Sequence, residues 1–114
     1  MIKTVNDKFI ETYNMMTDGF ESVETIYKLI LKNKLSEKDE AIASILLNRA
    51  ISKFTSAEAM YIIFSKDLKE SNLHNVFNLF YIFESEFIKE LIDNTSYGAT
   101  IEAYENLKNV IEQY

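Results

Sequence analysis

Residues 73–92 of this 114-residue chain read LHNVFNLFYIFESEFIKELI, the most apolar segment of the sequence. Apolar side chains recur there at every third or fourth position, which is the spacing of one face of an α-helix. We expect a helix from about residue 71 to 94 at the centre of an all-α protein, with its aromatic residues in the core. The positions that share this spacing are Leu73, Val76, Phe80, Phe83, Phe87 and Leu91.

A longer amphipathic segment opens the chain. In residues 4–33 an apolar side chain returns at every seventh position, which predicts one long helix with a single apolar face. Asp18 and Glu21 flank Gly19 with the spacing of a capping box, so the sequence leaves open a break at residues 17–19. The heptad positions are Ile2, Phe9, Met16, Val23 and Ile30.

A second long segment covers residues 36–69. It begins at Ser36, because a hydroxyl followed by acidic residues suits a helix N-terminus. Thr55 and Glu58 also have capping-box spacing, so a break near residue 55 stays open. The expected inner face consists of Ile42, Leu46, Ala50, Phe54, Ala57, Tyr61, Phe64 and Leu68.

A turn at residues 94–98 separates the apolar segment from a last amphipathic helix at 100–114. We therefore predict one all-α domain over residues 1–114, a compact bundle of four antiparallel helices. The number becomes five or six if the long helices break near 17–19 and 55. The helices are unequal in length and residues 59–64 are apolar on every side, so we expect a homodimer to cover the surplus apolar surface.

Several kinds of site are excluded by composition. The chain has no Cys, no Pro, one His and two Gly, which excludes disulfides, a thiol nucleophile, a cysteine-ligated metal and a glycine-rich phosphate loop. His74 follows Glu70 by one helical turn, but no further metal ligand can be named beside them. We expect no enzymatic activity, no metal and no cofactor.

The N-terminal residues lack the apolar segment of a signal peptide. No apolar run approaches the ~18 residues that a membrane-spanning helix needs. We therefore expect a cytoplasmic protein without a membrane span.

The formal net charge is −6, and it is unevenly distributed. Residues 84–114 hold seven acidic residues against two lysines, a net charge of −5. Such a surface repels nucleic acid and attracts a protein with a basic surface. The candidate partner-binding residues are Glu86, Glu90, Asp93, Glu102, Glu105 and Glu112.

One charged pair is a candidate for the core. Arg49 is the only arginine and lies near Ile45 and Leu46, on the side of its helix that we expect to be buried. Glu84 interrupts an apolar stripe of the 73–92 segment. Because arginine suits buried bidentate pairs, a buried Arg49–Glu84 ion pair is our hypothesis.

These features favour a small, non-enzymatic protein-binding module. Eleven of the twelve basic residues are Lys and the chain is rich in Ile and Asn, as is typical of AT-rich bacteria, phages or plasmids. We expect an inhibitor or adaptor of the anti-defence type that binds a host protein, by occupying a basic surface of it. Two alternatives stay open, an immunity protein against a bacteriocin or toxin and a structural dimer or subunit of a larger assembly.

Overall fold

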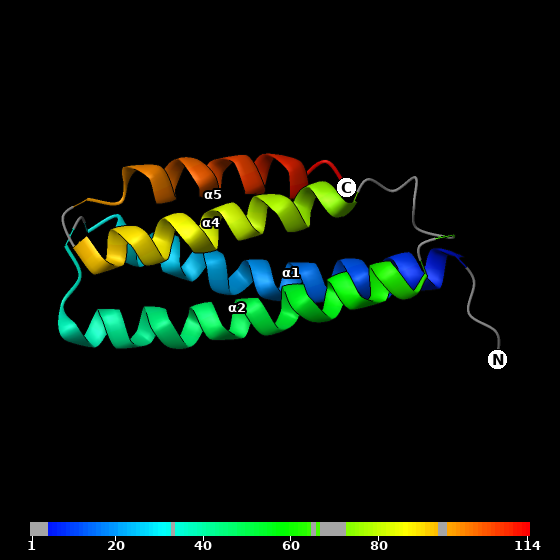
Figure 1. Ribbon diagram of the computed structural model, residues 1–114, viewed down its shortest axis with the longest axis horizontal. Helices are drawn as coiled ribbons and strands as arrows, with labels where there is room; N and C mark the ends of the chain where they lie inside the picture. Colours follow the sequence, from blue (N-terminus) through cyan, green and yellow to red (C-terminus); the bar gives the residue numbers. More distant parts are fainter. Residues whose placement is uncertain (1–4, 33, 65, 67–72, 94–95) are drawn as a thin grey trace.

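The computed structural model describes residues 5–32, 34–64, 66, 73–93 and 96–114. This part of the chain holds four helices and no strand, so the predicted all-α bundle is confirmed (Figure 1). The helices are α1 (Val5–Ile30), α2 (Glu37–Ile63), α4 (Leu73–Asp93) and α5 (Gly98–Ile111). They form an elongated bundle of 49 × 22 × 18 Å.

Both long helices are continuous. α1 runs without interruption through Gly19, and α2 through Thr55, so the alternative of breaks at 17–19 and near 55 is wrong. Gly19 has a packing role instead: a Cβ atom at this position would lie 2.8 Å from Cδ2 of Phe54 on α2. The missing side chain lets α1 and α2 approach each other closely.

The N-terminus of α2 is capped as expected. Ser36 Oγ accepts a hydrogen bond from the backbone N–H of Asp39 at 3.1 Å. The predicted inner face of the helix is confirmed at Ala50, Phe54 and Ala57, which are buried. It is wrong at Ile42, which is 36% exposed, and Ala43 and Leu47 are buried in the first turns instead. The buried residues of α2 are Ala43, Leu47, Ala50, Phe54 and Ala57.

α4 supplies much of the core, as its sequence predicts. Its buried face meets α2 through the rings of Phe80 and Phe54, which stack with centroids 4.1 Å apart. α5 is held against α1 by Tyr104, whose ring stacks on Tyr27 at 4.0 Å and on Phe20 at 5.7 Å. The buried apolar residues of all four helices form one continuous core.

The unequal helix lengths are visible in the bundle. α1 and α2 reach beyond α4 and α5 at the end near the chain's N-terminus (Figure 1). Ile62 and Ile63, in the last turn of α2, are 65% and 71% exposed. Apolar surface therefore remains uncovered on the long helices, as the sequence predicts.

Candidate protein-binding groove

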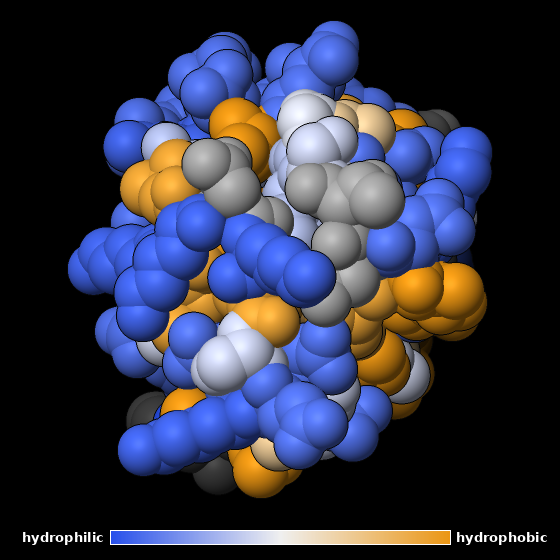
Figure 2. Space-filling view, turned by 90° about the vertical axis from the view of Figure 1, so that its left-hand side faces the viewer, coloured by the Kyte–Doolittle hydropathy of each residue, from blue (hydrophilic) through white to orange (hydrophobic). Residues whose placement is uncertain are grey.

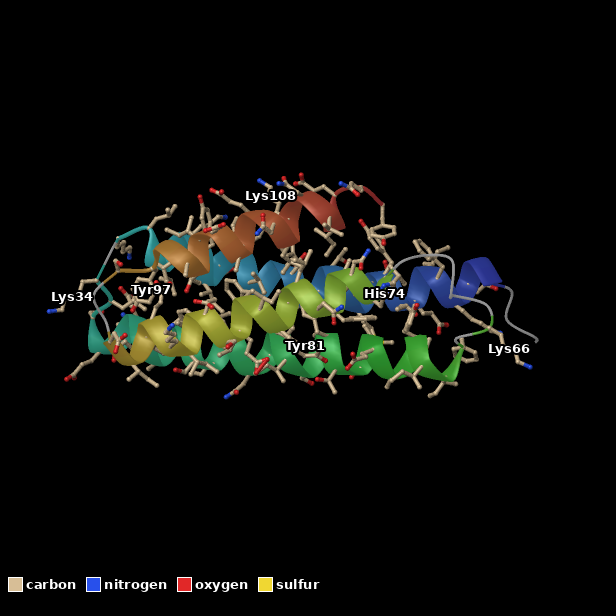
Figure 3. The ribbon with its side chains drawn as sticks, turned by 45° about the horizontal axis from the view of Figure 1, so that its top comes forward. Lys34, Lys66, His74, Tyr81, Tyr97 and Lys108 are labelled. Carbon is tan, nitrogen blue, oxygen red and sulfur yellow. The ribbon has the colours of Figure 1, made fainter. Side chains whose placement is uncertain are left out.

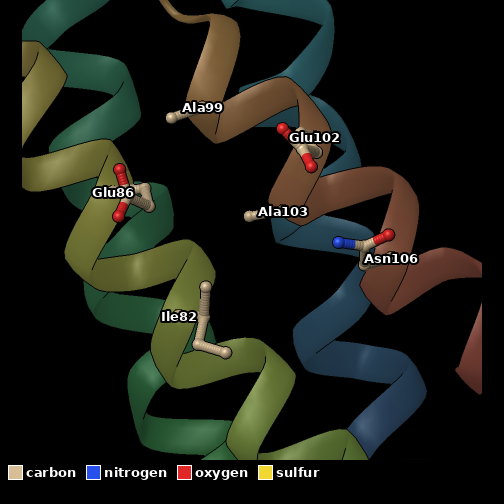
Figure 4. A pocket seen from close by; sticks show the side chains of 6 residues that line it. All are labelled: Ile82, Glu86, Ala99, Glu102, Ala103 and Asn106. Atoms are coloured by element: carbon tan, nitrogen blue, oxygen red, sulfur yellow. The ribbon is translucent and has the colours of Figure 1, made fainter.

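A shallow groove of about 210 Å³ lies between α4 and α5 (Figure 4). One wall comes from α4, where Ile82 and Glu86 are one helical turn apart. The other wall comes from one side of α5. The residues that line the groove are Ile82, Glu86, Ala99, Glu102, Ala103 and Asn106.

The groove combines an apolar base with acidic walls. Ala99 and Ala103 are too small to fill the space between the two helices, and Ile82 leaves 51% of its surface exposed beside them. Glu86 projects from α4 and Glu102 from α5, on opposite sides of this surface (Figure 4). An apolar strip between two carboxylates suits a side chain that has an apolar stem and a positive head.

Two more of the predicted acidic residues extend the negative surface along α5. Glu105 and Glu112 are exposed and lie three and ten residues after Glu102, so the three occupy one side of the helix. Glu112 Oε1 lies 4.0 Å from Lys108 Nζ, an exposed ion pair of small energy. Asp93 is exposed at the end of α4. None of these three lines the groove, but each adds to the negative potential around it.

Glu90 has a different environment from the other acidic candidates. Its Oε1 atom accepts hydrogen bonds from the backbone N–H and the hydroxyl of Thr100, both at 2.7 Å. Its Oε2 atom accepts from the backbone N–H of Ala99 at 3.3 Å. The carboxylate of Glu90 therefore caps the N-terminus of α5, and its role is structural.

The structure does not bring Arg49 and Glu84 together. Arg49 is exposed, because Ile45 and Arg49 lie on the outward face of α2, and Glu84 is half-buried. Within the described ranges no ion pair joins them. The hypothesis of a buried pair is wrong, because it placed Arg49 on the buried side of α2, whereas Arg49 is exposed there together with Ile45.

Four residues that line the groove could not be identified as site residues from charge or motif alone: Ile82, Ala99, Ala103 and Asn106. Ala99, Ala103 and Asn106 have the spacing of one helical face, so the sequence indicates a face of small and weakly polar side chains on the last helix. The contact of that face with α4 is a tertiary feature that helical periodicity does not contain.

The end of the bundle at which α1 ends is also where α2 and α5 begin (Figure 1). Figure 2 shows this end mostly covered by hydrophilic side chains, with hydrophobic ones in several patches between them. Its charges are mixed, since Lys32 Nζ lies 3.8 Å from Asp39 Oδ2. This lysine-containing end therefore lacks the uniform basic charge that nucleic-acid binding requires.

Other site types have little support in the described part of the chain. His74 is exposed (Figure 3), and Glu70 lies outside the described residues. No group of three His, Asp or Glu side chains gathers there as a metal site would need. None of the four described helices has the length and apolarity needed to cross a membrane.

Comparisons of the chain with protein-family models, curated proteins and solved structures gave no match.

Proposed function

We propose that this protein is a non-enzymatic binding module whose groove between α4 and α5 receives a basic side chain of a partner protein. The observation that supports this most directly is the pair of carboxylates, Glu86 and Glu102, on opposite walls of a groove with an apolar base. The remaining acidic residues of α4 and α5 surround the pair with further negative charge.

The size of the groove favours a side chain over a small-molecule ligand. Pockets for small molecules begin at about 300 Å³ and enclose most of their ligand. At about 210 Å³ the groove is smaller than this, and it is open. An arginine fits its chemistry best, because the stem packs on Ala99, Ala103 and Ile82 while the guanidinium reaches a carboxylate on either side.

The charge distribution supports an encounter with a basic protein. Residues 84–114 carry a net charge of −5 in a chain whose total is −6. A concentrated negative field accelerates association with a positive surface and weakens steeply with salt. An acidic module of this size suits an inhibitor or adaptor that covers a basic, nucleic-acid-binding surface of a host protein. An immunity protein that covers a basic toxin would use the same groove, and the partner's identity separates the two.

The test is an affinity pull-down of the tagged protein from a lysate of its source organism, at low salt and at ~0.5 M salt, where surface electrostatics are screened. The Glu86→Gln/Glu102→Gln variant removes the charges of the groove. The matched control is Glu21→Gln/Glu37→Gln, which removes two exposed charges from α1 and α2.

We expect a basic protein to be captured in stoichiometric amount at low salt and released at high salt. The groove variant should bind that protein at least ~10-fold more weakly, a loss of about 1.4 kcal/mol or more, while the control variant binds it normally. A partner that tolerates both high salt and the groove variant would contradict the proposal.

A further inference from the structure

The outward face of α2 is nearly free of charge. We define this face by the exposed residues of the helix between positions 41 and 63, of which Arg49 is the only charged one. Four isoleucines belong to it, and Ile45, Ile62 and Ile63 are each about two-thirds exposed. The face consists of Ala41, Ile42, Ser44, Ile45, Asn48, Arg49, Ser52, Thr55, Ser56, Ala59, Ile62 and Ile63.

This composition is unusual for a helix that faces water. An amphipathic surface helix carries charged residues on its outer side. α5 follows that rule with Glu102, Glu105 and Glu112, and α1 follows it with Asp18 and Glu21. α2 is apolar toward the core and uncharged or apolar toward solvent, as is typical of a helix packed between two partners.

We propose that a second copy of this chain covers the outward face of α2, with the two α2 helices antiparallel about a two-fold axis. The isoleucines stand at both ends of the face, Ile42 and Ile45 at one end and Ile62 and Ile63 at the other. Antiparallel pairing places Ile42 of one copy against Ile63 of the other, so each apolar end meets an apolar end. The side chains at the centre of the face, such as those of Ser52 and Ser56, are small enough for the two helices to approach closely.

Charge selects a second copy over another class of protein. Two copies at −6 each repel one another, and this repulsion is smallest when they meet through a neutral surface, which the outward face of α2 provides. α2 packs on α1 and α4, whereas α5 packs on α4 and α1, so a dimer through α2 keeps both acidic α5 surfaces remote from the interface (Figure 1). A strongly charged partner would find only Arg49 on this face and, at its edge, Lys53, whose Nζ lies 3.9 Å from Asp18 Oδ2.

The area of the face sets the expected strength of the dimer. Positions 41–63 of α2 form a face about 35 Å long and about 10 Å wide, which gives on the order of 700 Å² of flat area for two copies. Stable interfaces bury about 1,200 Å² or more, and smaller ones belong to transient complexes. We therefore expect a dimer that forms with rising protein concentration in the micromolar range.

The first test is the mass of the full chain by sedimentation velocity, from ~1 to ~500 μM. The wild-type protein should change from monomer to dimer over this range, and Ile45→Glu and Ile63→Glu should remain monomers with unchanged helix content. The matched control is Ile92→Glu, because Ile92 is 78% exposed on α4, and this variant should still dimerise. A wild-type monomer at every concentration, or a dimer that survives Ile45→Glu, would overturn the proposal.

The second test determines the orientation, since the chain has no cysteine of its own. In the antiparallel pair residue 52 lies close to the two-fold axis, whereas residues 44 of the two copies are about 25 Å apart along the axis at ~1.5 Å per residue. Oxidised Ser52→Cys should give a cross-linked dimer and Ser44→Cys should not. Equal cross-linking of both variants would indicate parallel helices and refute this arrangement.

Discussion

Gly19 shows how one residue controls the approach of two helices. Glycine inside a helix costs ~1 kcal/mol relative to alanine, a cost that adds to the capping-box spacing of Asp18 and Glu21 in favouring a break at this point. The structure gives the compensation: the backbone of α1 passes close to the ring of Phe54, which is fully buried and stacked on Phe80. Glycine at position 19 therefore lowers the intrinsic stability of the helix but allows α1 to pack closely against α2.

We predict that Gly19→Ala destabilises the protein although it adds a better helix former. The new methyl group would lie 2.8 and 2.9 Å from two ring carbons of Phe54, which cannot move without displacing Phe80. Overpacking of ~1–3 kcal/mol should exceed the ~1 kcal/mol gain in propensity. Gly98→Ala is the control, since nothing lies within 4 Å of its Cβ position. Denaturant unfolding of both variants measures the difference, and equal stabilities would contradict the packing role.

Two tyrosines connect helices through hydrogen bonds to glutamates. Tyr81 on α4 donates its hydroxyl hydrogen to Glu58 on α2 at 2.6 Å, and Tyr104 on α5 donates to Glu24 on α1 at 3.3 Å. Burial, followed by the effect of the adjacent glutamate, raises the pKa of each tyrosine from 10.0 to about 12. Both phenols therefore remain protonated in the folded protein at pH values where they ionise in the unfolded chain.

This difference predicts a loss of stability in alkali. Below pH 10 both states bind the phenolic protons, so the contribution of the two tyrosines is fully present. Between pH 10 and about 12 only the unfolded state releases them, which favours unfolding. Tyr81→Phe/Tyr104→Phe should flatten this part of the stability–pH curve, measured by guanidinium unfolding at pH 9 and 11.5. An unchanged slope would show that other groups cause the alkaline loss.

At the scale of the element, α5 depends on α4 for its N-terminus. Tyr97 occupies the N-cap position and makes no side-chain capping hydrogen bond. Glu90 supplies the acceptor from another helix, where its charge also suits the positive end of the helix dipole. The sequence identified the turn before α5, but a cap that comes from a different helix leaves no local pattern to read.

We predict that Glu90→Ala lowers the free energy of unfolding by about 1–2 kcal/mol, because two or three donors at the start of α5 lose their acceptor. Glu105→Ala is the matched control on an exposed position of α5 and should change stability by less than ~0.5 kcal/mol. Thermal unfolding followed by circular dichroism compares the two. If both variants unfold alike, Glu90 is not a structural cap.

The register of α2 marks the limit of what periodicity predicts. The start of α2 and the buried face of α4 follow from the sequence, because Ser36 is a strong N-cap and α4 has one strongly apolar face. The end of α2 does not, since the helix was expected to run to residue 69 and ends at Ile63. α2 is apolar on two opposite sides, so several stripes fit a helical spacing equally well. The expected stripe coincides with the buried one at Ala50, Phe54 and Ala57, but it was wrong at Ile42, and Arg49 was assigned to the wrong side of the helix.

At the scale of the whole molecule, sequence and structure contribute different parts of the candidate site. The concentration of acidic residues in 84–114 is readable directly from the sequence. The groove is not, since it exists only where α5 lies beside α4 and two alanines leave space between them. Of the six acidic candidates, Glu86 and Glu102 line one groove, whereas Glu90 has a structural role as the cap of α5.

The two proposed surfaces lie on different helices, so they should respond independently and with opposite sensitivity to salt. Raising the salt concentration from ~0.1 to ~1 M shortens the screening length from ~10 to ~3 Å, which weakens binding at the acidic groove. The apolar contact between α2 helices contains almost no charge to screen, so the dimer should persist or strengthen.

Substitutions on the two surfaces should likewise affect dimerisation and partner binding separately. Ile45→Glu should abolish the dimer and leave the affinity for a basic partner within about twofold, because α5 does not depend on the outward face of α2. Glu86→Gln/Glu102→Gln should weaken partner binding at least ~10-fold and leave the dimer unchanged. Sedimentation velocity measures the first property and calorimetric titration the second. Loss of both properties in either variant would show that the two surfaces are coupled, and would require an interface that includes α4 and α5.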